Sequence, residues 1–251
     1  MTTNVSQLFS DGSTQYAAAR PGYPRELFEF IFSQCPDFTK AWDCATGSGQ
    51  AAVSLAERFS VVEATDVSVE QISSALVHDR VIYSVQPAEA TPFPNACFSH
   101  VTVAQALHWF DLTRFWPEVH RVLKKGGLFA AWAYTWPHVT REIDHVVNAK
   151  LLGVIESYWL PQNRLAWDGY STISFPFRDQ PTPKFAMCLK WNLDQFVAYL
   201  GTWSATRRCL ERTGPYFFTE LSAALERIWG NRMSEREIRM EFYCRVGRYE
   251  S

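Results

Sequence analysis

The sequence predicts an α/β protein built on an open, mostly parallel sheet with helices on both faces. The first observation behind this prediction is that short apolar runs alternate with helix-like stretches about five times between residues 25 and 136. The second is that the run Leu128–Tyr134 is apolar throughout, as parallel strands buried on both faces are. The third is that glycine-rich and polar segments follow the ends of several runs, where open α/β sheets bind their ligands.

The chain is predicted to open with a loose polar leader and a first helix. Residues 1–15 form the leader, and a segment around an Arg-Pro-Gly turn follows it with two aromatic residues, Tyr16 and Tyr23. This segment could fold over a site as a lid or remain a solvated loop. Pro24 is well placed to open a helix from Arg25 to about Gln34.

A glycine-rich turn follows the first strand, which is predicted at residues 41–45. Gly47 and Gly49 lack a Cβ, so the backbone can turn sharply and approach a ligand closely. The helix predicted from Ala51 to Arg58 begins just after them, and its first N–H groups can bind an anionic or polar group. Together with Ala52, the glycines fit the G-x-G-x-x-G/A pattern of dinucleotide sites, although such residues also occur in purely structural turns.

Asp66 is the candidate for binding a ribose. It ends the second predicted strand, Val61–Thr65, and lies 17 residues beyond Gly49. A carboxylate at that position is suited to accept hydrogen bonds from both ribose hydroxyls. The alternative is that Asp66 is an N-cap or turn residue before the helix predicted at Val69–Val77.

The next elements complete the repeating part of the chain. Strands are predicted at Val81–Val85 and Phe98–Ala104, and a helix at about Leu112–Leu123 precedes the strand Leu128–Tyr134. Because the carboxyl ends of parallel strands share one edge of a sheet, the residues that follow these strands are predicted to surround one site. These residues are Glu89, Gln105–Trp109 and Tyr134–Trp136.

Residues 137–184 break the rhythm of strands and helices. A helix-like stretch, Arg141–Ser157, is followed by a loop rich in Pro, Asn and aromatic residues, which predicts an insertion that caps the site. The elements predicted after it are a strand, two helices and a last strand, at Phe185–Trp191, Leu193–Thr213, Tyr216–Trp229 and Glu237–Val246. We expect one domain over residues 1–251, divided into a lid and helix (1–36), a cofactor-binding core (37–136), the insertion (137–184) and a C-terminal part that completes the sheet (185–251).

The composition of the chain indicates which partners and which location to expect. The net charge is −2 and no run of Lys or Arg exceeds two residues, so nucleic acid is not an expected partner. The six cysteines form no C-x-x-C pair and predict buried thiols in a reducing compartment, with no metal site. The apolar stretches are too short to span a bilayer and the first residues are polar, so we expect a cytoplasmic protein. The oligomeric state is left open.

Five segments resemble the motifs of class I S-adenosylmethionine-dependent methyltransferases. They are Asp43–Gly49, Asp66, Ala88–Phe93, Ala106–Asp111 and Val122–Gly127. The leader Tyr16-x-x-x-Arg20-Pro21-x-Tyr23-Pro24 is also similar to that of the trans-aconitate-methyltransferase-like group, which acts on small molecules. The resemblance covers nearly the whole chain. It implies a methyltransferase type 11 domain with a Rossmann-like sheet of seven strands, the last of them reversed.

The resemblance also implies a cofactor, S-adenosylmethionine, and the residues around it. The implied cofactor-binding residues are Tyr16, Arg20, Asp43, Ala45, Thr46, Gly47, Gly49, Asp66, Val67, Ala88, Glu89, Gln105 and Ala106. The implied catalytic residues are His108, Tyr16 and Arg20. Ala45 stands where many members carry Gly, so its methyl group is expected near the cofactor.

Methyl transfer from a sulfonium mainly requires that two reactants be positioned and water excluded. A carboxylate acceptor needs no general base, whereas a hydroxyl does, and His108 is then the candidate; a histidine bonded to backbone is the alternative. Four aromatic residues could stabilise the cationic donor or belong to the core: Trp109, Trp132, Tyr134 and Trp136. The C-terminal arginines, among them Arg207 and Arg232, could bind an acidic substrate, but interleaved glutamates favour a solvated face.

We therefore expect methyl transfer to a small molecule, at a carboxylate or hydroxyl oxygen. Two alternatives stay open. The glycine pattern also fits an NAD(P)-dependent oxidoreductase. Ala45 leaves open a non-catalytic module that binds cofactor and serves a partner.

Overall fold

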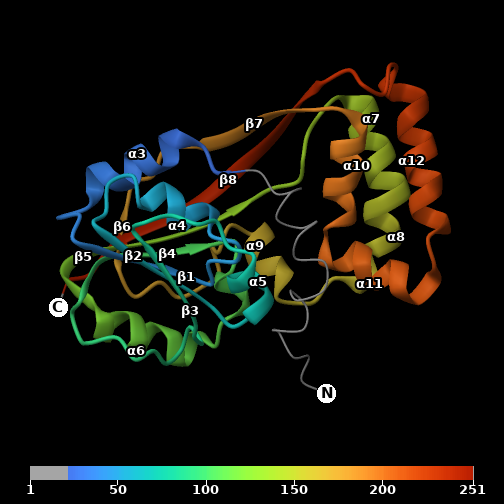
Figure 1. The fold of residues 1–251 in the computed structure, drawn as a ribbon. Helices are drawn as coiled ribbons and strands as arrows, with labels where there is room; N and C mark the ends of the chain where they lie inside the picture. The colour runs from blue at the N-terminus through green and yellow to red at the C-terminus, as the bar shows by residue number, and fades with distance from the viewer. Residues whose placement is uncertain (1–21, 251) are drawn as a thin grey trace.

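The molecule is built on an eight-stranded sheet with the order β3-β2-β1-β4-β5-β8-β6, and β7 also pairs with β8 (Figure 1). The structure is a computed structural model that describes residues 22–250. The strands are β1 (Lys40–Cys44), β2 (Val61–Asp66), β3 (Val81–Val85), β4 (Phe98–Ala104), β5 (Leu123–Tyr134), β6 (Arg178–Gln180), β7 (Phe185–Trp191) and β8 (Arg236–Arg248). Neighbours among β1–β5 are parallel, and β8 runs antiparallel to β5. The predicted mostly parallel sheet with a reversed last strand is confirmed.

The sheet has eight strands instead of the expected seven because a short strand, β6, forms within the predicted insertion, while the strand predicted at Phe185–Trp191 is β7. Both strands lie along the outer edge of β8, where Gln180 pairs with Val246 and Phe185 with Phe242. Pro181 lies between them, and a proline lacks the N–H that a strand donates to its neighbour. The link keeps contact with β8 through the Thr182 hydroxyl, which donates to the Cys244 carbonyl at 3.1 Å.

Helices cover both faces of the sheet, as predicted. On one face, α3 (Arg25–Gln34) and α4 (Gln50–Leu55) pack their apolar residues into one buried cluster, and on the other, α6 (Leu112–Val122) packs into a second cluster. The other helices are α5 (Val69–Ser73), α7 (Arg141–Val147), α8 (Gly153–Ile155), α9 (Asn163–Trp167), α10 (Leu193–Gly201), α11 (Ser204–Thr213) and α12 (Tyr216–Trp229). A π-helical turn and a 3-10 turn join α7 and α8 to Tyr158 in one helical stretch.

Three elements differ most from their predicted bounds. Helix α5 ends at Ser73, before the expected Val77, and the hydroxyls of Ser73 and Ser74 bond to carbonyl groups one turn back, which competes with helix continuation. The helix predicted over 193–213 is divided at Trp203, whose backbone is extended. Strand β5 begins at Leu123, where a turn was expected, and its pairing with β4 shifts register near Phe98.

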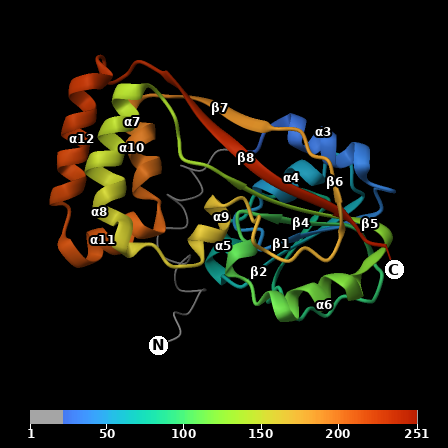
Figure 2. The ribbon, with the colours of Figure 1, turned by 180° about the vertical axis from the view of Figure 1, so that it is seen from behind.

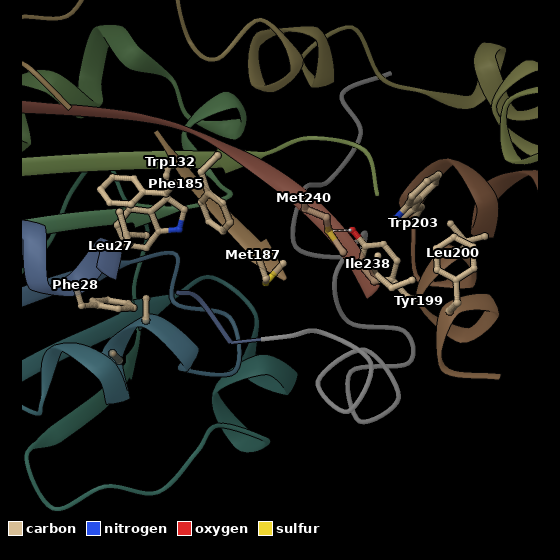
Figure 3. Close-up of a cluster of buried hydrophobic side chains, with 14 of the residues drawn as sticks. Leu27, Phe28, Trp132, Phe185, Met187, Tyr199, Leu200, Trp203, Ile238 and Met240 are labelled. Carbon is tan, nitrogen blue, oxygen red and sulfur yellow. Dashed lines mark hydrogen bonds between the residues drawn. The ribbon is translucent and has the colours of Figure 1, made fainter. Parts of the chain in front are cut away.

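A layer of helices stands beyond the end of the sheet (Figures 1 and 2). It is built from α7 and α8 together with α10, α11 and α12, so it joins the 137–184 stretch to the C-terminal part. Strands β7 and β8 connect the sheet to this layer, and one apolar cluster runs along them (Figure 3). That cluster passes from Trp132 over Met187 and Met240 to Tyr199 and Trp203, and the Tyr199 hydroxyl lies 3.5 Å from the Met240 sulfur. The helical layer is thus fixed to the sheet by a shared core.

Candidate active site

The turn after β1 holds three residues in the left-handed backbone region. Ala45 has φ +56°, Gly47 +56° and Gly49 +89°. The turn is fixed to its surroundings by Thr46, whose N–H donates to the Thr65 carbonyl at 2.8 Å and whose hydroxyl donates to Asp43 at 2.5 Å. A left-handed alanine costs about 1–2 kcal/mol, so Ala45 stands in a strained position that glycine would relieve.

Gly49 is required by packing as well as by backbone conformation. A Cβ on Gly49 would lie 2.1 Å from the Tyr83 hydroxyl oxygen, whereas one on Gly47 would meet its nearest neighbour, Gln71, at 3.8 Å. Gly47 lines the main cavity, and Gly49 is not among the residues that line it. Gly49 therefore packs closely against the Tyr83 side chain and not against a ligand. The backbone at Gly47 remains open to close approach by a ligand.

Asp66 stands at the carboxyl end of β2, beside the glycine turn. Its two carboxylate oxygens accept hydrogen bonds from the N–H groups of Gly47 and Ser68, each at 2.9 Å. Burial raises the pKa of Asp66, and these backbone hydrogen bonds oppose that rise. The cap of α5 is Ser68 and not Asp66, because the Ser68 hydroxyl accepts from Gln71. Each carboxylate oxygen has a second lone pair, so Asp66 keeps the capacity to accept from a ligand.

A cavity of ≈ 250 Å³ lies at the carboxyl ends of β1, β2 and β4. It brings together most of the residues that the sequence assigned to a cofactor: Ala45, Thr46, Gly47, Asp66, Val67, Ala88, Glu89, Gln105 and Ala106. Sequence reasoning gave no role to other lining residues, including Ser48, Gln71, Gln86 and Phe110. Ser48 and Phe110 lie within motif segments, whereas Gln71 and Gln86 lie outside them. Tyr16 and Arg20 lie outside the described residues. We call this space the cofactor cavity.

Asp43 lies beneath the cofactor cavity and is not part of its wall. The side chain is fully buried, and burial raises its pKa to about 7, against hydrogen bonds from Thr46 and the Ala52 backbone that favour the charged form. The nearby Asp66 carboxylate raises the Asp43 pKa further. Asp43 therefore acts from below the turn, through Thr46.

The residues of this cavity fit a cofactor that offers both donors and acceptors. The Ser48 Oγ and Gln105 Nε2 atoms line the cavity, are buried and have no hydrogen-bond partner among the described residues. Buried polar atoms are normally paired, so these atoms suit a ligand that completes their bonding. The lining carries two carboxylates, Asp66 and Glu89, and no Lys or Arg within the described part of the chain, which favours a cationic ligand.

A second chamber of ≈ 120 Å³ adjoins the cofactor cavity and shares Gln105, Trp109 and Tyr134 with it. Its other walls come from the turn after β4, the loop after β5, α9, and the helical layer with the segments that join it. The residues are His108, Thr135, Trp136, Trp159, Asn163, Ala166, Trp167, Tyr199, Thr202, Trp203, Ser204 and Arg207. We call it the tryptophan chamber. The sequence placed Trp136 and His108 near the site but gave no signal for Trp159, Trp167 or Trp203.

His108 lines the tryptophan chamber and not the cofactor cavity. Its Nδ1 lies 3.2 Å from the Tyr170 hydroxyl, and burial lowers the pKa of His108 to about 3. The imidazole is therefore held neutral. Of the four aromatic candidates, Trp132 is fully buried and packs against Tyr23 and Phe28, so it belongs to the core.

The C-terminal arginines lie in different settings. Arg232 pairs with Asp194 and Glu226 on an exposed face, as the solvated interpretation predicts. Arg208 donates to the Tyr158 carbonyl at 2.9 Å and ties α11 to the end of the 141–158 stretch. Arg207 lines the tryptophan chamber. Within residues 22–250 no group of three His, Cys, Asp or Glu side chains could hold a metal ion, and no helix there is long and apolar enough to cross a membrane.

The fold and the two adjoining spaces define a Rossmann-like enzyme that brings a cofactor and a second substrate together. A family model described as a methyltransferase domain matches residues 42–131. A Dictyostelium discoideum protein provisionally named as a methyltransferase is 32% identical over 206 residues, covering 80% of this chain and 78% of that protein. The chain belongs to the methyltransferases, as a class I S-adenosylmethionine-dependent enzyme.

Solved structures agree with this assignment. A structure from Anaeromyxobacter dehalogenans, provisionally named as a type II methyltransferase, shares 40% identity and a TM-score of 0.85, covering 92% of this chain and 99% of that one. A Geotalea uraniireducens protein named as a ubiquinone/menaquinone biosynthesis C-methyltransferase is 26% identical over 55% of this chain and 64% of its own length. The oxidoreductase and the non-catalytic module are set aside. The trans-aconitate-like subgroup stays a prediction.

Proposed function

We propose that this enzyme methylates an oxygen of a small molecule, and that the oxygen belongs to a carboxylate. The observation that carries the proposal is the chemistry of the tryptophan chamber, which adjoins the cofactor cavity through Gln105, Trp109 and Tyr134. Among its described lining residues, His108 is the one imidazole, and no carboxylate or lysine is present. The low pKa of His108 makes its neutral ring a weak base. A carboxylate acceptor loses no proton, so it suits such a chamber better than a hydroxyl.

The roles of the cofactor-cavity residues follow from their bonding. Bound S-adenosylmethionine supplies a methyl group on a positively charged sulfur. Asp66 would accept from the ribose hydroxyls while its bonds to Gly47 and Ser68 hold it in place. Glu89 lines the cavity and accepts from the Asp111 N–H at 3.0 Å, and it would lie beside the adenine. Gln105 would donate from Nε2 at the boundary of the two spaces.

The protein also aids methyl transfer by positioning the two reactants and by excluding water. Trp and Tyr side chains form a large share of the walls of the tryptophan chamber, and they would limit the access of water to the boundary at Gln105. A reaction that needs no proton transfer depends on holding its two reactants in line, which can lower a barrier by about 7–11 kcal/mol.

The proposal is tested with methyl-labelled S-adenosylmethionine and a panel of small carboxylic acids and their corresponding alcohols. Methyl esters release volatile labelled methanol in mild base, whereas methyl ethers and C-methyl products keep the label. We expect transfer to acids and base-labile product. Product that keeps the label in base would show a hydroxyl or carbon acceptor and overturn the carboxylate assignment.

A further inference from the structure

Polar side chains of the tryptophan chamber differ in whether the protein itself satisfies them. The Thr202 hydroxyl donates to the Tyr199 carbonyl at 2.6 Å, and the Thr135 hydroxyl accepts from a backbone N–H at 3.1 Å. Three other lining residues each keep a side-chain nitrogen that has no hydrogen-bond partner among residues 22–250: Gln105, His108 and Asn163. These three residues are therefore the ones whose nitrogens can bond to a ligand.

Gln105 stands at the boundary with the cofactor cavity in a left-handed backbone conformation, φ +58°, which is uncommon for a residue other than glycine. Its N–H donates to the Trp132 carbonyl at 2.9 Å, which fixes the turn after β4 to β5. Its Nε2 is buried and without a partner among the described residues. Strained residues persist only where their surroundings hold them, so the fold places this amide at the boundary at a cost.

Tyr170 determines where the proton of His108 lies. Its hydroxyl lies 3.2 Å from His108 Nδ1. Burial raises the pKa of Tyr170 against a backbone hydrogen bond from Leu107, so the hydroxyl keeps its proton. Tyr170 is fully buried, so this proton needs an acceptor, and Nδ1 is the one within hydrogen-bond distance in the described part of the chain. Nδ1 therefore carries no proton, and the neutral imidazole carries its proton on Nε2.

An unusual turn holds Tyr170 against His108. Gly169 and Tyr170 are both left-handed, with φ +63° and +59°, and a Cβ on Gly169 would lie 2.6 Å from the Tyr243 ring. The Tyr170 N–H donates to the Leu165 carbonyl at 2.8 Å, and the Tyr170 carbonyl accepts from Arg245 at 3.2 Å. These bonds on both sides of the residue fix a backbone conformation that a tyrosine rarely adopts.

Asn163 presents its amide nitrogen because its oxygen is already bonded. The Asn163 Oδ1 accepts from the Leu160 N–H at 3.1 Å, and the Asn163 N–H donates to the Leu160 carbonyl at 3.0 Å. A backbone N–H must meet the oxygen of the amide, so the donor group lies on the other branch of the side chain. Asn163 is 8% exposed and lines the chamber, and α9, which it begins, packs against the turn that holds His108.

We propose that Gln105, His108 and Asn163 bind the carboxylate of the acceptor through their side-chain N–H groups, and that Tyr170 is the positioning residue that fixes His108 as a donor. The inference rests on the proposed carboxylate methylation and names the residues that hold its substrate. A carboxylate only accepts hydrogen bonds, and bonds to a charged acceptor are about twice as strong as those between neutral groups. A hydroxyl has a proton of its own to place, and these three nitrogens offer it no acceptor.

This assignment gives His108 a binding role without proton transfer. With a proton on Nε2 and Nδ1 occupied by Tyr170, the neutral imidazole has no free nitrogen that could take a proton from the acceptor. The acid therefore enters the chamber already ionised, and no proton moves during methyl transfer.

The first test uses nitrogen NMR to read the tautomer of His108 in protein that carries isotope-labelled histidine and is saturated with S-adenosylhomocysteine. We expect a proton on Nε2, and an Nδ1 signal that shifts toward that of an unbonded nitrogen in Tyr170→Phe. Tyr216→Phe, on the exposed surface of α12, is the control and should leave both signals unchanged. A proton on Nδ1 in the wild-type protein would overturn the proposal, whether or not the Tyr170 variant folds.

The second test compares the binding of propanoate and of its neutral amide, propanamide, to the same protein. The acid offers only acceptors, so we expect it to bind about tenfold more tightly and to shift the His108 Nε2 signal. Asn163→Asp keeps the oxygen that accepts from Leu160 but replaces the donor with a second oxygen, so it should abolish the preference. Asn231→Asp is the matched control, because its Oδ1 also accepts a backbone N–H, from Met233 at 2.9 Å, on an exposed face.

Two variants of His108 separate donation from shape. His108→Gln places an amide nitrogen near the position of Nε2 and should keep part of the preference for propanoate, whereas His108→Leu should lose it. Equal binding of propanoate and propanamide by wild type would contradict the proposal. So would a preference that survives in both Asn163→Asp and His108→Leu while S-adenosylhomocysteine binding is intact.

These outcomes are distinct from a failure of the proposed function. If Nδ1 carries the proton while acids of the labelled panel still become methyl esters, the donor assignment is wrong and carboxylate methylation stands. If Nε2 carries the proton and propanoate binds, but the label reaches only hydroxyl or carbon atoms, the proposed function fails at the acceptor atom.

Discussion

The cofactor cavity and the tryptophan chamber share three residues but are built in different ways. The cofactor cavity is formed mostly by turns at the ends of neighbouring strands, and backbone N–H groups hold its central carboxylate, Asp66. The tryptophan chamber is formed by large side chains that come from segments between residues 105 and 207. The first depends on backbone conformation over short stretches, and the second depends on how the helical layer docks on the sheet.

The two spaces also differ in charge. Carboxylates line the cofactor cavity, and a guanidinium lines the tryptophan chamber. The two carboxylates of the cofactor cavity suit a cationic methyl donor. The comparison shows that the carboxylates and the guanidinium of this region line separate spaces.

The largest expected effect concerns the backbone on which the cofactor cavity depends. Gly49→Ala places a methyl group on the Tyr83 hydroxyl in a left-handed conformation, so we expect the free energy of unfolding to fall by about 2–5 kcal/mol. The matched control is Gly126→Ala, which has φ +76° and no heavy atom within 4 Å, so it should lose only the conformational part. Denaturant unfolding measures both. Equal losses would show that the contact with Tyr83 contributes nothing.

The next effect concerns the carboxylate of the cofactor cavity. Asp66→Ala removes an acceptor for ribose and releases the Gly47 N–H, so we expect affinity for S-adenosylhomocysteine to fall about 10- to 100-fold. Glu57→Ala, on the exposed surface after α4, is the control and should bind as wild type does. Calorimetry measures both, and a wild-type affinity in Asp66→Ala would remove the ribose contact from the account.

The cofactor cavity could be predicted from sequence better than the tryptophan chamber. The reason is that the cavity is built from local patterns, whereas the chamber depends on how separate segments dock. The glycine turn and Asp66 are local patterns, and their meeting follows once parallel strands are inferred. Trp136, Trp159 and Trp203 lie in separate segments of the chain, and each looks like a core residue on its own. The sequence also missed the short strand β6 before Pro181, and it did not show that Asp43 is fully buried beneath the turn.

A smaller effect tests the burial of Asp43. Because the folded-state pKa of about 7 exceeds the unfolded value near 3.8, the folded protein binds more protons between these values. The free energy of unfolding should therefore fall as pH rises from about 4 to about 7, by up to about 1.4 kcal/mol per pH unit. Asp43→Asn should reduce this slope but not abolish it, because the pKa of Asp66 is also raised. Denaturant unfolding without ligand measures the slope, and an unchanged slope would contradict the burial argument.

The last prediction is that His108, in the tryptophan chamber, does not change its protonation state near neutral pH. Burial lowers the pKa of His108 to about 3, so its ring signals in the NMR spectrum should stay constant between pH 5 and pH 8. The signal is assigned by its loss in His108→Gln. A titration in that range would give the chamber a usable base and would favour a hydroxyl acceptor.

The most direct test of the central claim asks whether the cofactor cavity binds the product of the methyl donor. S-adenosylhomocysteine is titrated into wild-type protein by calorimetry, and NADH is titrated as the control. The account predicts micromolar or tighter binding of S-adenosylhomocysteine and no binding of NADH. No binding of S-adenosylhomocysteine, or binding of NADH alone, would contradict it.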